Sequence, residues 1–309
     1  MNVPVKLGLF GLGLAALYIA SFATAGAVVP SQAAAVWAQP TEGQVMDRND
    51  TRPAASVQGL SIEQDGFLLG EISSPRMAGQ EGTLSFTISD ATGKPVTDFE
   101  PSHDKKLHLI VVRTDGTQFR HVHPALDALG VWSLPWKWNA AGSYRVYADI
   151  VPAATGQNIT LTRTVQAAGE FAPATPAPIS AVDTVDGYNV DLTGTLSASE
   201  QAMLTVSVSR EGEPVTTLQP YLGSYGHLVA LREGDLAYLH VHPEGEEPRP
   251  GAVSGPDVTF MTEAPTPGRY LLYLDFQVDG QVHTAQFVLT ATGLATSADP
   301  GEPAEHSGH

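Results

Sequence analysis

Cysteine is absent from the 309-residue chain. Its absence excludes disulfide bonds, thiolate metal sites and a catalytic thiol. Methionine is also scarce, with five residues, so few thioether ligands are available for Cu(I). Any metal that the chain binds is therefore expected to be a metal that accepts imidazole, such as Cu(II), Zn or Ni, and Cu(II) forms the strongest complexes of the three.

Basic residues are few as well. The 16 Lys and Arg residues stand against 33 Asp and Glu residues, which gives a net charge of −17. Binding to a phosphate backbone needs a cationic surface, so we expect no nucleic-acid partner. Sequence signatures of catalysis are missing too, because no nucleophile elbow, glycine-rich phosphate loop or paired-carboxylate motif occurs. We therefore expect a protein that is not an enzyme.

Residues 7–29 form a stretch of 23 residues (29 − 7 + 1) without a charge, directly after Lys6. Because about 20 apolar residues span a bilayer, we expect an N-terminal hydrophobic helix that anchors the protein in the cytoplasmic membrane. Ala23-Thr24-Ala25 and Val36-Trp37-Ala38 also fit signal-peptide cleavage sites, and cleavage would give a secreted protein. Either outcome places the remaining chain outside the cytoplasm, at the cell surface.

The remaining composition favours an all-β fold. The 30 Gly and 23 Pro residues are spread among β-branched and aromatic residues, which predicts many short strands joined by turns. Apolar and polar residues alternate over residues 84–89 and 204–208, as in half-buried strands. Residues 144–149 and 270–275 both read Tyr-x-x-Tyr-x-Asp after a glycine, which resembles a late strand of an immunoglobulin-like sandwich.

We therefore expect two tandem immunoglobulin-like (cupredoxin-like) β-sandwich domains after the N-terminal helix. The expected boundaries are 1–29 for the membrane anchor or signal segment, 30–56 for a flexible stalk, 57–166 for the first repeat, 167–181 for a Pro/Ala linker, 182–293 for the second repeat and 294–309 for a disordered tail that contains histidine.

One histidine pattern occurs in both repeats. Its members are His108, His121 and His123 in the first repeat and His227, His240 and His242 in the second. Corresponding members are 119 positions apart (227 − 108, 240 − 121, 242 − 123), and together they account for six of the ten histidines. Identical spacing in two copies predicts that the three residues act together.

Turn residues place the first triad on one hairpin. Asp115-Gly116 is a strong hairpin signal between two β-rich segments. A two-residue loop there pairs positions whose numbers sum to 231 (115 + 116), which sets His108 opposite His123 and Ile110 opposite His121. Because side chains alternate along a strand, all three imidazoles then face the same side.

Gly234-Asp235 predicts the same arrangement in the second repeat. Here the paired positions sum to 469 (234 + 235), so His227 lies opposite His242 and Val229 opposite His240. Facing Cβ atoms are about 5 Å apart, a separation that imidazoles bridge through a metal bonded to nitrogen at about 2 Å. Each triad is therefore a candidate metal site with an open coordination position.

Three further residues are candidates. His103 precedes His108 by five residues and corresponds to Leu222, so it is a candidate fourth ligand in the first site only. Asp149 and Asp275 end the Tyr-x-x-Tyr-x-Asp motifs and are candidates for orienting a ligand imidazole. The structural alternatives are a loop histidine and carboxylates that bond backbone amides.

The hairpins resemble a group of actinobacterial secreted or membrane-anchored two-repeat proteins that are loosely described as heavy-metal-binding or YtkA-like. The residues that carry the resemblance are His103 to Arg113 with Phe119 to Pro124, and Gln219 to Gly223 with Gly226 to Arg232. The similarity covers residues 57–293. It implies export, the internal repeat and a link to metal, and it supplies no reaction.

Two main hypotheses remain. The first is a membrane-anchored, extracytoplasmic protein that binds copper or zinc ion at two three-histidine sites and serves metal tolerance or delivery. The alternative is a structural or interaction protein whose histidines only pack. Because Ile110, Val112 and Phe119 share the face of the first triad, burial of that face would favour the alternative. A zinc hydrolase is the least favoured hypothesis, since no carboxylate stands at the spacing of a general base.

Overall fold

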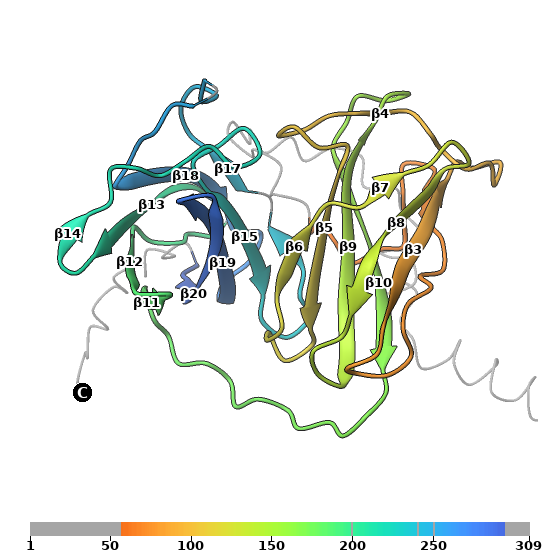
Figure 1. Cartoon of the computed structure of the whole chain (residues 1–309), viewed down its shortest axis with the longest axis horizontal. Helices are drawn as coiled ribbons and strands as arrows, with labels where there is room; N and C mark the ends of the chain where they lie inside the picture. Colours follow the sequence, from red (N-terminus) through yellow and green to blue (C-terminus); the bar gives the residue numbers. More distant parts are fainter. Residues whose placement is uncertain (1–56, 199, 240, 250, 294–309) are drawn as a thin grey trace, which may run out of the picture. The chain divides into compact units, whose positions relative to one another are not determined.

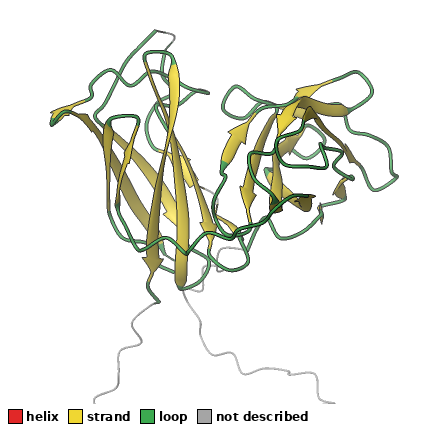
Figure 2. Ribbon diagram, turned by 60° about the horizontal axis from the view of Figure 1, so that its bottom comes forward, coloured by secondary structure: helices red, strands yellow, loops and turns green. Residues whose placement is uncertain are grey.

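The computed structural model describes residues 57–198, 200–239, 241–249 and 251–293, and these residues form strands and turns with no helix among them (Figure 2). The all-β prediction is therefore confirmed. The expected anchor (1–29), stalk (30–56) and tail (294–309) lie outside the described residues. None of the described segments is a helix long and apolar enough to cross a membrane.

The first sandwich contains the strands β1 (Glu63–Gln64), β2 (Phe67–Leu69), β3 (Glu81–Ser89), β4 (Phe99–Glu100), β5 (Leu107–Arg113), β6 (Arg120–Val122), β7 (Ala125–Leu126), β8 (Val131–Lys137), β9 (Gly142–Pro152) and β10 (Ile159–Ala167). One sheet has the order β1-β2-β3-β8-β7 and the other β10-β9-β5-β6, with β4 paired to β9. Strands β3 to β10 are labelled in Figure 1. All pairs in these sheets are antiparallel.

The second sandwich repeats this order. It contains β11 (Val182–Val185), β12 (Tyr188–Thr193), β13 (Gln201–Arg210), β14 (Glu213–Pro214), β15 (His227–Arg232), β16 (Tyr238–Leu239), β17 (Val241–Pro243), β18 (Asp257–Glu263), β19 (Gly268–Val278) and β20 (Gln281–Ala291). Its sheets run β11-β12-β13-β18-β17 and β16-β15-β19-β20. In both repeats the strands follow the immunoglobulin arrangement, with strands A, B, E and D in one sheet and C′, C, F and G in the other.

A tyrosine corner supports the same assignment. In immunoglobulin-like sandwiches, a Tyr near the start of strand F donates its hydroxyl hydrogen to the backbone a few residues upstream. Tyr144 in β9 donates to the Ala140 carbonyl at 2.7 Å, and Tyr270 in β19 donates to the Thr266 carbonyl at 2.9 Å. The first Tyr of each Tyr-x-x-Tyr-x-Asp motif therefore closes its own domain, and the prediction of immunoglobulin-like sandwiches is confirmed.

Each sandwich has its own apolar core. The alternating strand residues Leu84, Phe86 and Ile88 are buried in the first core, as the sequence predicts. Leu204 and its neighbours on β13 do the same in the second core. Strand β5 is unusual, because every one of its residues is buried and neither of its faces is exposed to solvent.

The outward face of β5 packs against the second sandwich. Ile110, Val112 and Tyr147 of the first repeat share one buried cluster with residues of the second. The members from the second repeat are Val229, Leu231, Leu236, Tyr238, Leu271, Tyr273 and Val288. The C and F strands of the two repeats thus cover one another with the faces that carry the histidines.

Candidate metal centre

The predicted hairpin register is present in both repeats. Strand β6 pairs with β5 so that Ile110 lies opposite His121, and β16 pairs with β15 so that Leu231 lies opposite Tyr238. The first loop is longer than the expected two residues, because Arg113 N donates to Thr117 O and Gly116 N to Arg113 O. Gln118, with a φ of 57°, is the additional residue that restores the register.

The chain crosses to the other sheet just beyond the first hairpin. Strand β6 ends at Val122 and β7 begins at Ala125, so His123 lies at the crossing and not on a ladder position. The second repeat crosses earlier, and His242 in β17 pairs with Met261 of β18. The predicted ladder pairing of His242 with His227 is therefore wrong, because this strand is strand D of the opposite sheet. The backbone of His240 and the side chain of His242 lie outside what the structure describes.

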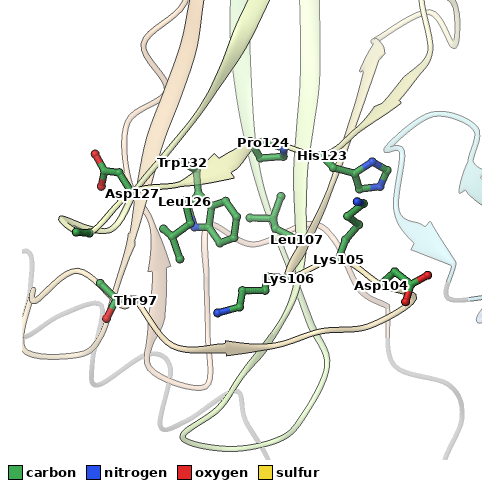
Figure 3. Close-up of a pocket in the computed structure, with 11 residues that line it drawn as sticks. Thr97, Asp104, Lys105, Lys106, Leu107, His123, Pro124, Leu126, Asp127 and Trp132 are labelled. Carbon is green, nitrogen blue, oxygen red and sulfur yellow. The ribbon is translucent and has the colours of Figure 1, made fainter. Parts of the chain in front are cut away.

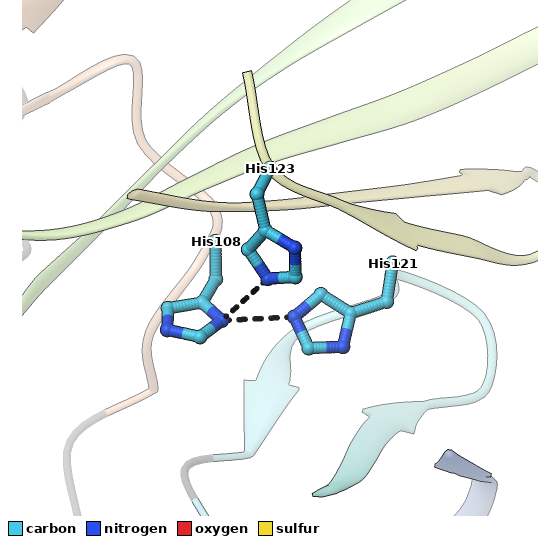
Figure 4. A group of neighbouring side chains, drawn as sticks. All are labelled: His108, His121 and His123. Atoms are coloured by element: carbon cyan, nitrogen blue, oxygen red, sulfur yellow. Dashed lines mark hydrogen bonds between the residues drawn. The ribbon is translucent and has the colours of Figure 1, made fainter. Parts of the chain in front are cut away.

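The three rings of the first triad converge, although only His121 is placed by the register between β5 and β6. His108 Nδ1 lies 2.9 Å from His121 Nε2 and 3.2 Å from His123 Nε2 (Figure 4). The three rings have centroid separations of 4.9 to 5.2 Å. One nitrogen from each ring lies within 4.8 Å of the other two, which is the spacing of a group that can hold a metal ion.

Oxygen acceptors fix the hydrogen positions on two of these rings. His108 Nε2 lies 2.9 Å from the Ser102 carbonyl, so this nitrogen carries a hydrogen and donates it. His121 Nδ1 lies 3.0 Å from Asp275 Oδ2 and donates to that carboxylate. In the neutral rings, His108 Nδ1 and His121 Nε2 are then left with lone pairs that face each other at 2.9 Å. Such a pair needs a metal ion, or a further hydrogen, between the two nitrogens.

Asp275 belongs to the second repeat, so the first triad is completed by the other domain. Its Oδ1 accepts a hydrogen bond from Thr284 at 2.6 Å, which holds the carboxylate in place. The His121 and Asp275 side chains are only 3% and 5% exposed. Asp149, the corresponding residue of the first repeat, accepts from Asn158 at 2.8 Å and from Thr160 at 3.1 Å. It lies opposite His108 in the β5–β9 ladder.

His227 joins this cluster from the second repeat. It lies on the interface face of β15, and its ring centroid is 6.2 Å from that of His108 and 5.9 Å from that of His121. Its Nε2 lies 2.8 Å from the Tyr221 carbonyl and donates to it. The same kind of acceptor, six residues upstream in each case, therefore orients His108 and His227.

Ser102 and Tyr221, which supply the two carbonyl acceptors, are each the first residue of a tight turn. Ser102 and Lys105 exchange two backbone hydrogen bonds, and His103 and Asp104 between them have φ values of 48° and 63°. Positive φ at both central positions defines a type I′ turn, which normally prefers Asn and Gly. A histidine held in this conformation costs backbone strain. Its ring lies 5.3 Å from His227 and 6.2 Å from His108, so His103 lies at the edge of the cluster.

Burial keeps three of the imidazoles neutral. Burial, followed by the neighbouring His121, lowers the pKa of His108 to about 4. Burial and His121 likewise lower the pKa of His227 to about 3 and that of His123 to about 2. At neutral pH these rings therefore offer lone pairs, and this is the protonation state that metal binding requires.

Two cavities are lined by members of the triad. The smaller has a volume of about 40 Å³ and is lined by His103, His108, His121, His227 and Asp149 among others. It exceeds the roughly 10–15 Å³ that a single water molecule occupies by the same measure. The larger, about 640 Å³, opens beside His123 and is lined also by Lys105, Lys106 and Asp127 (Figure 3). The triad is thus buried on the side of His108 and reaches a pocket at His123.

Two of the three nitrogen separations are close to those of a metal site, and the third, between His121 and His123, is within 4.8 Å. Nitrogen atoms bound at about 2.05 Å in a tetrahedral site lie about 3.3 Å apart, and the two triad distances are 2.9 and 3.2 Å. Shifts of a few tenths of an ångström would admit the ion. The carbonyl and carboxylate acceptors behind His108 and His121 are the groups that usually orient metal-bound imidazoles.

Sequence reasoning did not find every part of this site. It treated the triads as two separate sites, whereas Asp275 and His227 of the second repeat lie beside the first triad. It also missed the backbone acceptors at Ser102 and Tyr221. One signal was available, because the continuous apolar run of β5 is typical of a strand covered on both faces.

A family model described as a domain of unknown function (DUF8832) matches the chain twice, over residues 63–169 and 183–293. The two matched segments agree with the expected internal repeat. The description of this family contains neither the heavy-metal-binding nor the YtkA-like name that the sequence resemblance suggested. No curated protein matches the chain.

Solved structures give only distant similarity. A Salmonella alpha-2-macroglobulin is 18% identical, with 77% of this chain and 15% of that chain covered and a TM-score of 0.26. The bacterial integrin-binding protein invasin is 13% identical, with 73% and 39% covered and a TM-score of 0.21. A protein from Corynebacterium diphtheriae described as membrane anchored is 10% identical, with 74% and 59% covered and a TM-score of 0.22. The chain spans a minor part of the first two, and TM-scores this low support no argument about function.

Proposed function

We propose that the chain, which belongs to the family of domains of unknown function DUF8832, is a non-enzymatic, extracytoplasmic protein. It binds a transition-metal ion at His108, His121 and His123. Cu(II) and Zn are the metals that suit three imidazoles. The apolar stretch at residues 7–29 supports attachment to the cytoplasmic membrane, with both sandwiches outside the cytoplasm. The proposal includes a role in metal tolerance or delivery, for which the pocket at His123 offers a path to the site.

One observation carries the proposal. The Ser102 carbonyl and the Asp275 carboxylate accept the ring hydrogens of His108 and His121, so in the neutral rings two lone pairs face each other at 2.9 Å. His123 adds a third nitrogen at 3.2 Å from His108. A metal ion removes the repulsion between the lone pairs and leaves both acceptors satisfied.

Titration calorimetry on residues 57–293 tests the proposal, since this segment lacks the apolar stretch and the tail histidines His306 and His309. We expect Zn²⁺ and Cu²⁺ to bind at micromolar concentration. In a His240→Ala background, which removes a predicted ligand of the second triad, about one equivalent is expected from a three-histidine site. Adding His121→Ala should abolish this binding.

His283→Ala is the matched control, because His283 is also a buried histidine with a carboxylate partner, Asp186 at 2.8 Å, and lies outside the cluster. Metal binding should be unchanged in this variant. Absence of heat with either metal in the unmodified segment would refute the proposal.

A second candidate is a structural or interaction protein in which the histidines join the two sandwiches without metal. The buried cluster between the repeats and the contact of His121 with Asp275 favour it. In this case a hydrogen bond joins His121 Nε2 to His108 Nδ1, and His121 Nδ1 donates to Asp275. Thermal unfolding separates the candidates: His121→Ala lowers the melting temperature in both, but only a metal-binding protein loses its stabilisation when a chelator is added.

A further inference from the structure

We propose that the metal site is shared between the two repeats, with His227 supplying a fourth nitrogen, so that metal binding holds the two sandwiches together. The inference rests on the proposed function, because it requires the triad to bind metal. It goes beyond that function by assigning a ligand from the second repeat and a consequence for the joint between the domains.

The ring of His227 lies close to the distance expected for a fourth ligand. Metal-bound imidazoles in a tetrahedral site have ring centroids about 5.2 Å apart when the bonds are about 2.0 Å long. Within the triad the separations are 4.9 to 5.2 Å, and His227 lies 5.9 Å from His121 and 6.2 Å from His108. The His227 ring is therefore within about 1 Å of the spacing of a fourth ligand relative to His108 and His121, but its nitrogens are not part of the group that lies within 4.8 Å, so the ring must move toward the triad to bind the ion. It lines the same small cavity as His108 and His121.

The ring of His227 is hydrogen-bonded in the same way as that of His108. Its Nε2 donates to the Tyr221 carbonyl, just as His108 Nε2 donates to the Ser102 carbonyl. The lone pair of the neutral ring is then on Nδ1, the same atom that His108 offers to the triad. His227 is only 8% exposed, so its ring is held among groups of both repeats.

Metal binding is thermodynamically linked to docking of the two repeats. An ion held by ligands from two bodies binds tightly only while these bodies are docked, so its binding free energy stabilises the docked state. Asp275 strengthens this coupling, because it orients His121 from the second repeat. Opening of the joint must then become rarer when metal is added.

Amide hydrogen exchange on the full chain tests the inference. With Zn²⁺ at ten times its dissociation constant, exchange through openings that release the ion slows about tenfold. We expect this protection in β5 and β6 of the first repeat and equally in β15 and β19 of the second. The distant strands β3 and β12, which lie in the opposite sheets, serve as internal references.

His227→Ala should keep the protection in β5 and β6 and lose most of it in β15 and β19. His103→Ala tests the other nearby imidazole and should leave the pattern unchanged, and His283→Ala is the control for removal of a buried histidine from the second repeat. Protection confined to the first repeat in the unmodified chain would overturn the inference and leave the proposed function intact. Absence of any metal-dependent protection, with no heat in the titration, would instead refute the proposed function.

Discussion

At the scale of single residues, the acceptor behind each imidazole decides what the ring offers to the site. His108 and His227 donate to backbone carbonyls, whose positions depend only on the preceding turns. His121 donates to a carboxylate that belongs to the other repeat. A carboxylate acceptor makes an imidazole a stronger ligand than a carbonyl does, because its negative charge raises the basicity of the opposite nitrogen.

Asp275→Asn is therefore expected to weaken metal binding by about 10- to 100-fold. The amide keeps the size of the side chain but removes the charge that supports His121. Competition with a chelator of known affinity measures the change. The matched control is Asp149→Asn, because Asp149 is the equivalent residue of the first repeat and bonds Asn158 and Thr160. Equal losses in both variants would contradict the orienting role of Asp275 and indicate a general effect of negative charge.

At the scale of strands and turns, much of the site was predictable from the sequence. Turn pairs and alternation predicted the register that sets Ile110 opposite His121, and the structure confirms it. The predicted register is correct although the predicted loop length is wrong, since Gln118 compensates for the longer turn. The pairing of His242 was not predictable in this way, because alternation within a strand does not reveal to which sheet the next strand belongs.

The contact between the two histidine faces was also beyond the pattern. Apolar residues at Ile110 and Val112 indicate that something covers this face, but they fit any apolar partner equally well. The covering partner is the second repeat, and only the three-dimensional structure identifies it. The face is buried, which favours the structural alternative as expected, and burial by another histidine face is also compatible with a metal site.

The loop of the first hairpin gives a prediction of its own. Burial raises the pKa of Asp115, but hydrogen bonds from Arg113, the Ala174 amide and Thr117 outweigh it and hold the pKa well below the ordinary 3.8. A carboxylate with a lowered pKa stabilises the folded state fully above its unfolded pKa, and the stabilisation is lost as pH falls below about 4. Asp115→Asn should thus destabilise the protein at about pH 5 and have much less effect near pH 2.

Urea unfolding at both pH values checks this expectation. The expected quantity is the difference in unfolding free energy between the unmodified protein and Asp115→Asn, which should shrink as the pH is lowered. A difference that is the same at both pH values would show that the carboxylate charge does not contribute. Because Ala174 belongs to the connection between the sandwiches, loss of the bond should also increase proteolysis of residues 168–181.

At the scale of the whole molecule, the two repeats contact each other reciprocally. Tyr147 of the first repeat donates to the Leu236 carbonyl at 2.5 Å, and Tyr273 of the second donates to the Gly116 carbonyl at 2.6 Å. Each second Tyr of the Tyr-x-x-Tyr-x-Asp motif thus holds the hairpin loop of the other repeat. This is the pattern of a two-fold interface, in which the same surface occurs on both sides. The motif closes its own domain with one Tyr and the joint with the other.

Gly116 is packed closely against the second repeat at this joint. Its φ is +80°, and a Cβ atom there would lie 2.5 Å from Leu271 Cδ1 of the second repeat. Gly234 in the other hairpin has a φ of +105° and no atom within 4 Å of the corresponding Cβ position. Alanine at either position suffers backbone strain of about 1–2 kcal/mol, but only alanine at 116 must displace a buried side chain of the interface.

Gly116→Ala is therefore expected to destabilise the protein by about 1 kcal/mol more than Gly234→Ala, at the low end of the cost of overpacking, because the added Cβ atom meets the tip of a flexible side chain. Urea unfolding measures the difference. The same displacement moves Leu271 and Tyr273 on β19, the strand that carries Asp275. Gly116→Ala should thus also weaken metal binding, whereas Gly234→Ala should not. Equal stability and equal metal affinity in the two variants would show that close packing of the hairpin loop against the second repeat does not control the site.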